Sequence, residues 1–529
     1  MRPTEIPGQM YPGFDGYVRI VTTDDPVAQA WFDQGIQLLY GFNHDEAIRS
    51  FQQAAALDPD CAMAHWGEAY ARGLHINNPV MGREQSELAH VAAKRAVAAL
   101  DDETPVEHAL VHAVAQRYVL PVPDDRTHLD EAYAAAMQLV WEAHPDDPDV
   151  GPLYAESMMN LQPWDLWTPD GEPKGRTEEI LAVLEQSMTN VPDHPGANHF
   201  YIHAIEASPW PEKGTTAAER LVDLVPGSGH LVHMPAHIFI RTGRYADAAD
   251  ANVRALAADD RYLDLAPQPT FYWVYYMHNA HFLAYAAMME GRYETALVAA
   301  RKIKRDVPIE FVEALPEVAD GLTPVAYHVL LRFGKWEQVL AEPEPQDWRW
   351  SSRATRHYAR AVALANLGRL DEAHAELAAL DSVAEMFDDS WYVGVNQAAD
   401  VFATARKTAE GEMAYHAGDP DRAFALLDEA VAMEEALAYD EPPGWMQPVR
   451  HALGALLLAE GKAERAEAVY RADLKRHPNN GWSLRGLHDA LAMQGRGEDA
   501  DAIKPKLAAA FVRADVEPIA SCYCHPDAD

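Results

Sequence analysis

Cysteine is scarce in this sequence, with three residues in 529, and two of them, Cys522 and Cys524, lie close to the C-terminus. The third, Cys61, stands alone. A chain this poor in cysteine does not depend on a disulfide framework. The C-x-C-H stretch at 522–525 could bind a soft metal such as Cu(I), and the alternative interpretation is an exposed, reducible tail.

Basic residues and long apolar runs are scarce as well. The chain has 43 Lys and Arg against 82 Asp and Glu, a net charge of −39. Because such a surface repels phosphate backbones and anionic lipids, we expect no nucleic acid partner and no membrane partner. The sequence contains no stretch of about 18 apolar residues, so it predicts no membrane span. The first residues lack the apolar segment of a secretory signal, so the expected location is cytoplasmic.

Strand patterns are rare, and most of the chain consists of Ala-, Leu- and Glu-rich helical windows separated by Gly or Asp-Pro turns. The segment 28–59 matches the 34-residue tetratricopeptide repeat. Its consensus positions are occupied by Trp31, Gly35, Ala47, Phe51, Ala54 and Pro59. Small residues at two of these positions let the two helices of a hairpin approach closely, and the larger ones fill the space between hairpins.

Weaker copies of this pattern follow along the chain. They begin near residues 62, 113, 198, 229, 277, 320, 354, 404, 447 and 481. Stacked repeats share one continuous apolar core. The sequence therefore predicts an all-α protein, a right-handed superhelical tetratricopeptide solenoid over 28–514. An N-terminal arm (1–27) would precede it, a C-terminal tail (515–529) would follow it, and an inserted loop at 160–175 would interrupt it.

Several longer motifs resemble one family of bacterial tetratricopeptide proteins. They include PWDLW at 163–167, HPGANHFYIHAIEAS at 194–208, GHLVHMPAHIFIRTGRY at 229–245 and MHNAHFLAYAAMMEGRY at 277–293. The resemblance covers about residues 25–500. It implies the repeat fold, with the first helix of each hairpin lining a concave groove, and it implies no particular activity. The chain lacks the basic clamp with which many such repeats hold peptide C-termini.

Histidines occupy the expected groove positions of three successive repeats. They are His199, His203, His230, His233, His237, His278 and His281. Each lies three or four residues from another, so each pair shares one face of its helix. Pro235 lies between His233 and His237 and could spoil that pair's geometry.

Neutral imidazole is a preferred ligand for copper, iron and zinc, so these spacings predict a transition metal ion in the groove. The alternative is a metal-free polar lining of the groove that binds an organic ligand or an anion. We expect His199, His203, His233, His237, His278 and His281 to be the ligands. Catalytic roles are expected for Glu206, as an acid/base or as the group that orients a ligand, and for His230, as a ligand or a proton shuttle.

Aromatic and polar residues near these histidines are candidates for a substrate pocket, although packing in the core would explain the aromatic ones equally well. The candidates are His75, Asn77, Trp164, Trp167, Trp273, Tyr276 and Arg450. Trp164 and Trp167 belong to the 160–175 loop, which we expect to close over the site.

Two main functions remain open, beside metal storage or delivery, which would give the C-x-C-H stretch at 522–525 a role. The first is a metal-dependent enzyme that oxidises or hydrolyses a small molecule or a short peptide in the groove. The second is a non-catalytic scaffold that grips a peptide or a partner protein. Loops that seal the groove would favour the first, and a long open groove would favour the second. No Gly-rich phosphate loop, nucleophile elbow or HExxH motif is present.

Overall fold

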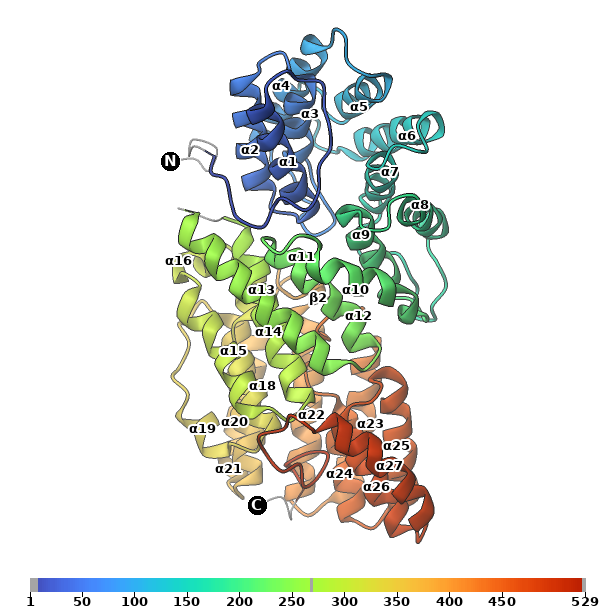
Figure 1. The fold of residues 1–529 in the computed structure, drawn as a ribbon. Helices are drawn as coiled ribbons and strands as arrows, with labels where there is room; N and C mark the ends of the chain where they lie inside the picture. Colours follow the sequence, from blue (N-terminus) through green and yellow to red (C-terminus); the bar gives the residue numbers. More distant parts are fainter. Residues whose placement is uncertain (1–7, 267–269, 526–529) are drawn as a thin grey trace. The chain divides into compact units, whose positions relative to one another are not determined.

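The chain folds as a succession of α-helices (Figure 1), and the computed structural model describes residues 8–266 and 270–525. Two short strands, β1 (Tyr392–Val393) and β2 (Asn396–Gln397), form the one sheet of the described part. The prediction of an all-α tetratricopeptide-repeat protein is confirmed. The chain forms two compact units, unit 1 (Met1–Ile238 and Val253–Tyr272) and unit 2 (Phe239–Asn252 and Trp273–Asp529).

Unit 1 consists mainly of the first eleven α-helices and the short 3-10 helix η2, which pack against one another in sequence order. They are α1 (Pro26–Tyr40), α2 (His44–Leu57), α3 (Ala62–Ala71), α4 (Arg83–Ala99), α5 (Pro105–Ala115), α6 (Thr127–Ala143), α7 (Val150–Met159), α8 (Thr177–Asn190), α9 (Pro195–Ile205), η2 (Pro211–Gly214), α10 (Thr215–Leu224) and α11 (Gly229–His233). Three helices include residues of both units: α12 (Pro235–Arg241), α13 (Tyr245–Leu265) and α14 (Tyr272–Met289).

Unit 2 continues with further helix pairs, among which α20 packs on α21 and α22 on α23. Its remaining helices are α15 (Tyr293–Asp306), α16 (Ile309–Ala314), α17 (Pro316–Ala319), η3 (Asp320–Leu322), α18 (Val325–Arg332), α19 (Trp336–Ala341), α20 (Trp350–Asn366), α21 (Leu370–Ala384), α22 (Ala398–His416), α23 (Pro420–Ala436), α24 (Val449–Ala459), α25 (Ala463–Arg476), α26 (Gly481–Met493) and α27 (Gly497–Ala510).

The first hairpin shows why the repeat consensus produces this packing. The ring of Phe51 on α2 is fully buried between Gly35 on α1 and Gly67 on α3. A Cβ atom at Gly35 would lie 2.7 Å from the Phe51 ring, and one at Gly67 would lie 2.4 Å from it. Both distances are far shorter than a van der Waals contact, so only glycine permits the helices to close on this ring.

The same packing of one aromatic ring between two glycines recurs in unit 2. There, Tyr470 on α25 lies between Gly454 on α24 and Gly486 on α26. A Cβ at Gly454 would lie 2.4 Å from the Tyr470 ring and one at Gly486 only 2.1 Å from it. An aromatic residue between two glycines therefore sets the spacing of neighbouring helices in each unit, as the repeat pattern predicts.

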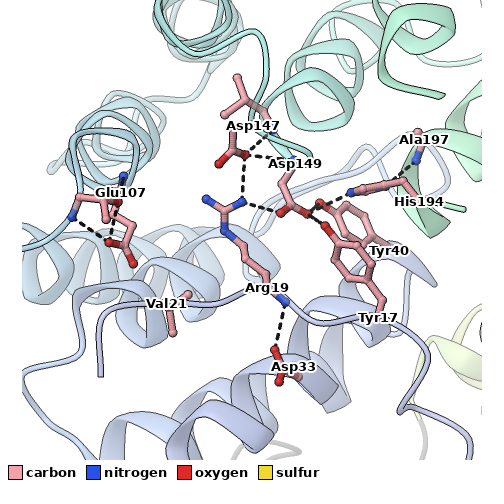
Figure 2. A network of polar contacts seen from close by, with 12 residues as sticks. Tyr17, Arg19, Val21, Asp33, Tyr40, Glu107, Asp147, Asp149, His194 and Ala197 are labelled. Atoms are coloured by element: carbon pink, nitrogen blue, oxygen red, sulfur yellow. Dashed lines mark hydrogen bonds and ion pairs between the residues drawn. The ribbon is translucent and has the colours of Figure 1, made fainter. Parts of the chain in front are cut away.

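The segment before α1 is fastened to unit 1 by a buried carboxylate, that of Asp149 (Figure 2). Oδ2 of Asp149 accepts a hydrogen bond from Arg19 at 2.5 Å, and Oδ1 accepts from the hydroxyls of Tyr17 and Tyr40 at 2.9 and 2.5 Å. Asp149 is completely buried. Burial alone would raise the pKa of Asp149, but Arg19 and His194 bring it well below its usual range.

The same carboxylate positions the start of α9. Nε2 of His194 donates to Oδ1 of Asp149 over 3.1 Å, so Nδ1 of the neutral ring is an acceptor. Nδ1 then accepts the amide of Ala197 at 3.0 Å and caps the first turn of α9, whose first residue is Pro195. The N-terminal segment, α7 and α9 are therefore tied together through Asp149 (Figure 2).

The C-terminal segment is pinned to unit 2 as far as residue 525. The carboxylate of Asp515 accepts from the backbone amides of Tyr293 and Glu294 at the start of α15. Arg332 donates to the carbonyl of Ser521 at 3.0 Å. The last residues of the predicted tail, 526–529, lie outside the described residues. Within 8–266 and 270–525, no helix is long and apolar enough to cross a membrane.

Replacing Asp149 by Asn should destabilise unit 1 strongly, because the buried Arg19 guanidinium would lose the fully buried one of its two carboxylate partners and keep only Asp147. We expect a loss of about 3–5 kcal/mol in the free energy of unfolding at neutral pH, measured by urea denaturation. Asp124→Asn is the control, since Asp124 pairs only with the exposed Arg83 and should lose less than about 1 kcal/mol. Similar losses in the two variants would contradict this account of Asp149.

Glu434 on α23 should make unit 2 less stable at alkaline pH. Burial raises the pKa of Glu434 to about 8, so the folded state holds a proton that the unfolded chain releases near its ordinary value. This contribution is complete below the ordinary carboxyl pKa, is lost as the pH rises from there through the folded-state value of about 8, by up to about 1.4 kcal/mol per pH unit, and changes no further above it. Thermal melts of the wild type, recorded from acidic pH to above about pH 8, should show the fall in stability. Glu434→Gln, a neutral mimic, should show less of it, and parallel curves would refute the assignment.

Candidate metal centre

Helix α9 supplies two histidines and a carboxylate. His199 and His203 are one turn apart on the helix, and Glu206 is its C-cap residue. Their exposed fractions are 0%, 4% and 0%. Because His194 and Pro195 fix the first turn of α9, the direction in which His199 points is fixed by the network around Asp149.

The next two helices supply three more histidines. His230 and His233 lie on α11, and His237 lies on α12. Pro235 is the first residue of α12, a position where proline fits well, and it divides the expected single helix into two short ones. The break does not separate the pair, since Nε2 of His233 lies 2.8 Å from Nε2 of His237.

These five histidines and Glu206 form a buried cluster within unit 1, here called the histidine centre. Nε2 of His199 lies 3.1 Å from Nε2 of His230. One ring nitrogen from each of His199, His203 and His230 lies within 4.8 Å of the others. Two imidazole nitrogens on one tetrahedral zinc-like ion are about 3.3 Å apart. Three rings are therefore close to the spacing that one ion requires.

Outer hydrogen bonds fix which nitrogen of each ring is available. Nδ1 of His199 lies 2.7 Å from the carbonyl oxygen of Tyr40, which can only accept, so the proton is on Nδ1. Nδ1 of His203 donates to Oε1 of Glu206 at 2.9 Å, and Nδ1 of His237 donates to Oε2 at 2.5 Å. In the neutral rings of His199 and His203, Nε2 therefore carries the lone pair. Histidines that bind metals are usually held in this way.

The Nε2 atom of His203 is the strongest indication of a ligand. It is buried out of reach of water and has no hydrogen-bond partner in the described structure. A buried polar atom left in this state is costly. A bare metal ion is smaller than a water molecule and can reach a lone pair that water cannot.

The electrostatics of the centre favour neutral rings. Burial and the neighbouring His203 lower the pKa of His199 well below its ordinary value, and burial also lowers the pKa of His203. Burial alone would raise the pKa of Glu206, but His237 and His203 bring it well below its usual range. At neutral pH the centre thus combines an ionised carboxylate with uncharged imidazoles at His199 and His203, the forms that a cation needs.

Two aromatic residues in strained conformations pack against the histidines. Phe42 and Trp164 have φ angles of 56° and 63°, and they are two of the three non-glycine residues with positive φ in the described chain. The ring of Phe42 lies 4.7 Å from that of His199, and the ring of Trp164 lies 5.1 Å from that of His203. Bulky residues rarely adopt this conformation, and such strain is concentrated at functional sites.

The 160–175 loop closes over the centre through Trp164. Its Nε1 donates to the carbonyl of Ile76 at 3.0 Å. A pocket beside it is lined by Ile76, Met159, Trp164 and Leu166 and reaches His203 and Glu206. Trp167 of the same loop donates to the carbonyl of Ala204 on α9 at 2.8 Å. Within unit 1, the loop therefore covers the histidine centre on the side of His203.

His75 also lies in unit 1, and the structure places it deeper than expected. Its ring stacks on Phe42 with centroids 4.3 Å apart, and its Nδ1 is buried without a hydrogen-bond partner. Burial, His44 and His199 lower the pKa of His75 well below its usual value. Asn77 is half-buried in the turn between His75 and Asn78, whose backbones are hydrogen-bonded to each other. The role of both residues as pocket walls remains a prediction.

The other expected site residues belong to unit 2 and stay predictions. His278 and His281 line a pocket there, and Nε2 of His281 lies 3.0 Å from Sδ of Met446. Tyr276 is fully buried, and its hydroxyl donates to Asp306. Trp273 packs edge-on against the Tyr276 ring. Arg450 is paired with Glu435.

The cysteines of the C-x-C-H stretch lie in unit 2 as well. Cys522 and Cys524 form a disulfide. A disulfide removes the two thiolates that a soft metal would bind, so metal binding by this stretch requires its reduction.

Phe42 and the Tyr40 carbonyl were not identified from the sequence, although both belong to the histidine centre's surroundings. A backbone carbonyl carries no residue-type signal. Phe42 offers one, because it replaces the usual glycine or asparagine at the turn between α1 and α2 in the stretch GFNH at 41–44.

No protein-family model matches this chain, and no curated protein matches it significantly. Among solved structures, a human IFIT1 dimer with m7Gppp-AAAA is similar over 94% of this chain and 96% of its own, at 12% identity and a TM-score of 0.34. Yeast Tom70 is similar over 93% of this chain and 95% of its own, at 12% identity and a TM-score of 0.30. TM-scores this low carry no argument about function.

Glu206→Gln should weaken the centre even without metal. A Gln side chain offers one acceptor oxygen, so an Nδ1–H of His203 or His237 would face an amide donor. We expect a loss of about 1–3 kcal/mol in unfolding free energy, measured by urea denaturation in a chelator. In long-range ¹H–¹⁵N spectra, one of the two rings should change tautomer. Glu212→Gln, at an exposed site nearby, is the control, and unchanged tautomers in Glu206→Gln would refute the bridging role.

Proposed function

We propose that this chain is a transition-metal-binding helical-repeat protein, in which Nε2 of His203 binds an ion together with His199 and His230. The observation that carries the proposal is the Nε2 atom of His203. It is buried, it has no hydrogen-bond partner, and a ring nitrogen of His203 lies close to one from each of His199 and His230. The Tyr40 carbonyl and Glu206 already hold the Nδ1 protons of His199 and His203, so their Nε2 lone pairs are available for the ion.

The ligand set favours copper, iron or zinc. The donors are neutral imidazoles, no thiolate takes part, and the carboxylate of Glu206 is already engaged by two ring protons. Hard ions such as magnesium and calcium prefer oxygen ligands, whereas imidazole suits copper, iron and zinc. An ion of this kind supplies Lewis-acid or redox chemistry when bound.

We propose further that the centre acts on a small molecule, by oxidation or hydrolysis. None of its five rings is more than 4% exposed, and Trp164 covers His203. A peptide lying along a repeat groove would not reach these atoms. In this assignment Glu206 orients His203 and His237, His230 binds the ion, and Trp164 keeps bulk water away.

The test is metal analysis of the purified protein after it is stripped with a chelator, reloaded with Cu(II), Fe(II) or Zn(II), and desalted. We expect at least one ion per chain. His203→Gln should weaken binding by more than the 10- to 100-fold that an outer hydrogen-bonding partner contributes. His128→Gln, at an exposed histidine in unit 1, should bind like the wild type.

Absence of bound metal after each of the three loadings would refute the proposal. It would favour the alternative, a non-catalytic scaffold that binds a peptide or partner protein. Equal binding by His203→Gln and the wild type would place the ion elsewhere. Far-ultraviolet circular dichroism and urea midpoints of the stripped proteins establish that each variant is folded before its affinity is compared.

A further inference from the structure

We infer that the histidine centre holds two metal ions, the second bound by His233 and His237. This inference rests on the proposed function, because it adds an ion next to the one at His199, His203 and His230. The two groups of rings are parts of one buried cluster in unit 1, and each group contains a close pair of Nε2 atoms.

The His233–His237 pair has the form of a two-ligand half-site. Both rings are buried, with exposed fractions of 0% and 3%. Their planes are nearly perpendicular, at 82°, and their Nε2 atoms are 2.8 Å apart. The two Nε2 atoms are hydrogen-bonded to each other, and a cation that displaces the bridging proton can bind both rings after a small outward shift.

Glu206 links this half-site to the first one. Its Oε1 accepts the Nδ1 proton of His203, and its Oε2 accepts that of His237. One carboxylate therefore imposes the same tautomer on a ring of each group. Nε2 is therefore the nitrogen that each ring offers to an ion, His203 to the first ion and His237 to the second. A site for a single ion would need Glu206 to fix the tautomer of only one of these two rings.

The two groups are near enough for their ions to interact. The rings of His203 and His237 have centroids 6.0 Å apart. His230 of the first group and His233 of the second stack at the same separation, with planes 25° apart. Ions on the Nε2 sides of these rings would lie a few ångströms apart, as in two-metal sites, where the separation is about 3.5–4 Å.

The experiment loads the stripped full-length protein with excess Cu(II) and desalts it. Copper is then counted by mass spectrometry and unpaired spins by electron paramagnetic resonance. We expect two copper ions per chain and a spin count below half of the copper count, because neighbouring Cu(II) ions couple magnetically. His237→Gln should bind one copper with a full spin count. His128→Gln should behave like the wild type.

Each other outcome decides a different point. One copper per chain with a full spin count in the wild type overturns the second ion and leaves the proposed function standing. Two copper ions in both the wild type and His237→Gln place the second ion elsewhere, and a full spin count for two ions overturns their adjacency. Absence of copper refutes the proposed function itself. His233→Gln provides a second variant if His237→Gln does not fold.

Discussion

The histidine centre depends on one buried carboxylate that accepts two imidazole protons. Glu206 is completely buried, and a carboxylate in that position is stable only if it is fully hydrogen-bonded. His203 and His237 meet that need and in return receive a fixed tautomer. The negative charge also favours any cation that arrives nearby. Hydrogen bonding, ring orientation and charge at this site are thus aspects of a single interaction.

The surrounding aromatic residues shield the hydrogen bonds of Glu206 from solvent. Phe42 lies against His199 and His75, and Trp164 lies against His203. Both adopt backbone conformations that L-residues avoid. Neighbouring contacts hold them there, for example the hydrogen bond from Trp164 to the Ile76 carbonyl. With water excluded, electrostatic interactions inside the centre are stronger than they would be at the surface.

The repeat architecture was predictable from sequence, because Gly35 and Phe51 occur at offsets that only closely packed helix hairpins explain. The histidine spacing likewise predicted that the rings of α9 and of α11–α12 would gather, and the 160–175 loop was expected to close over them. The proline at 235 indicated a disruption between His233 and His237, but not that the two rings would stay in contact across it. The double role of Glu206 was less accessible, because it depends on how helices from different repeats approach each other, which no local pattern encodes. The carbonyl of Tyr40 has no signature at all, since every residue has one.

The link from Arg19 to Asp149 has a consequence for the order of events during synthesis. The two residues are 130 positions apart, and His194, which Asp149 orients, emerges from the ribosome later still. Arg19 of the N-terminal segment can therefore pair with Asp149 only after the intervening part of unit 1 has been synthesised. Until Asp149 and His194 are joined, the first turn of α9 lacks its cap and His199 lacks a fixed direction. The geometry of the histidine centre thus belongs to the completed unit, and in a nascent chain the same histidines are only loosely spaced.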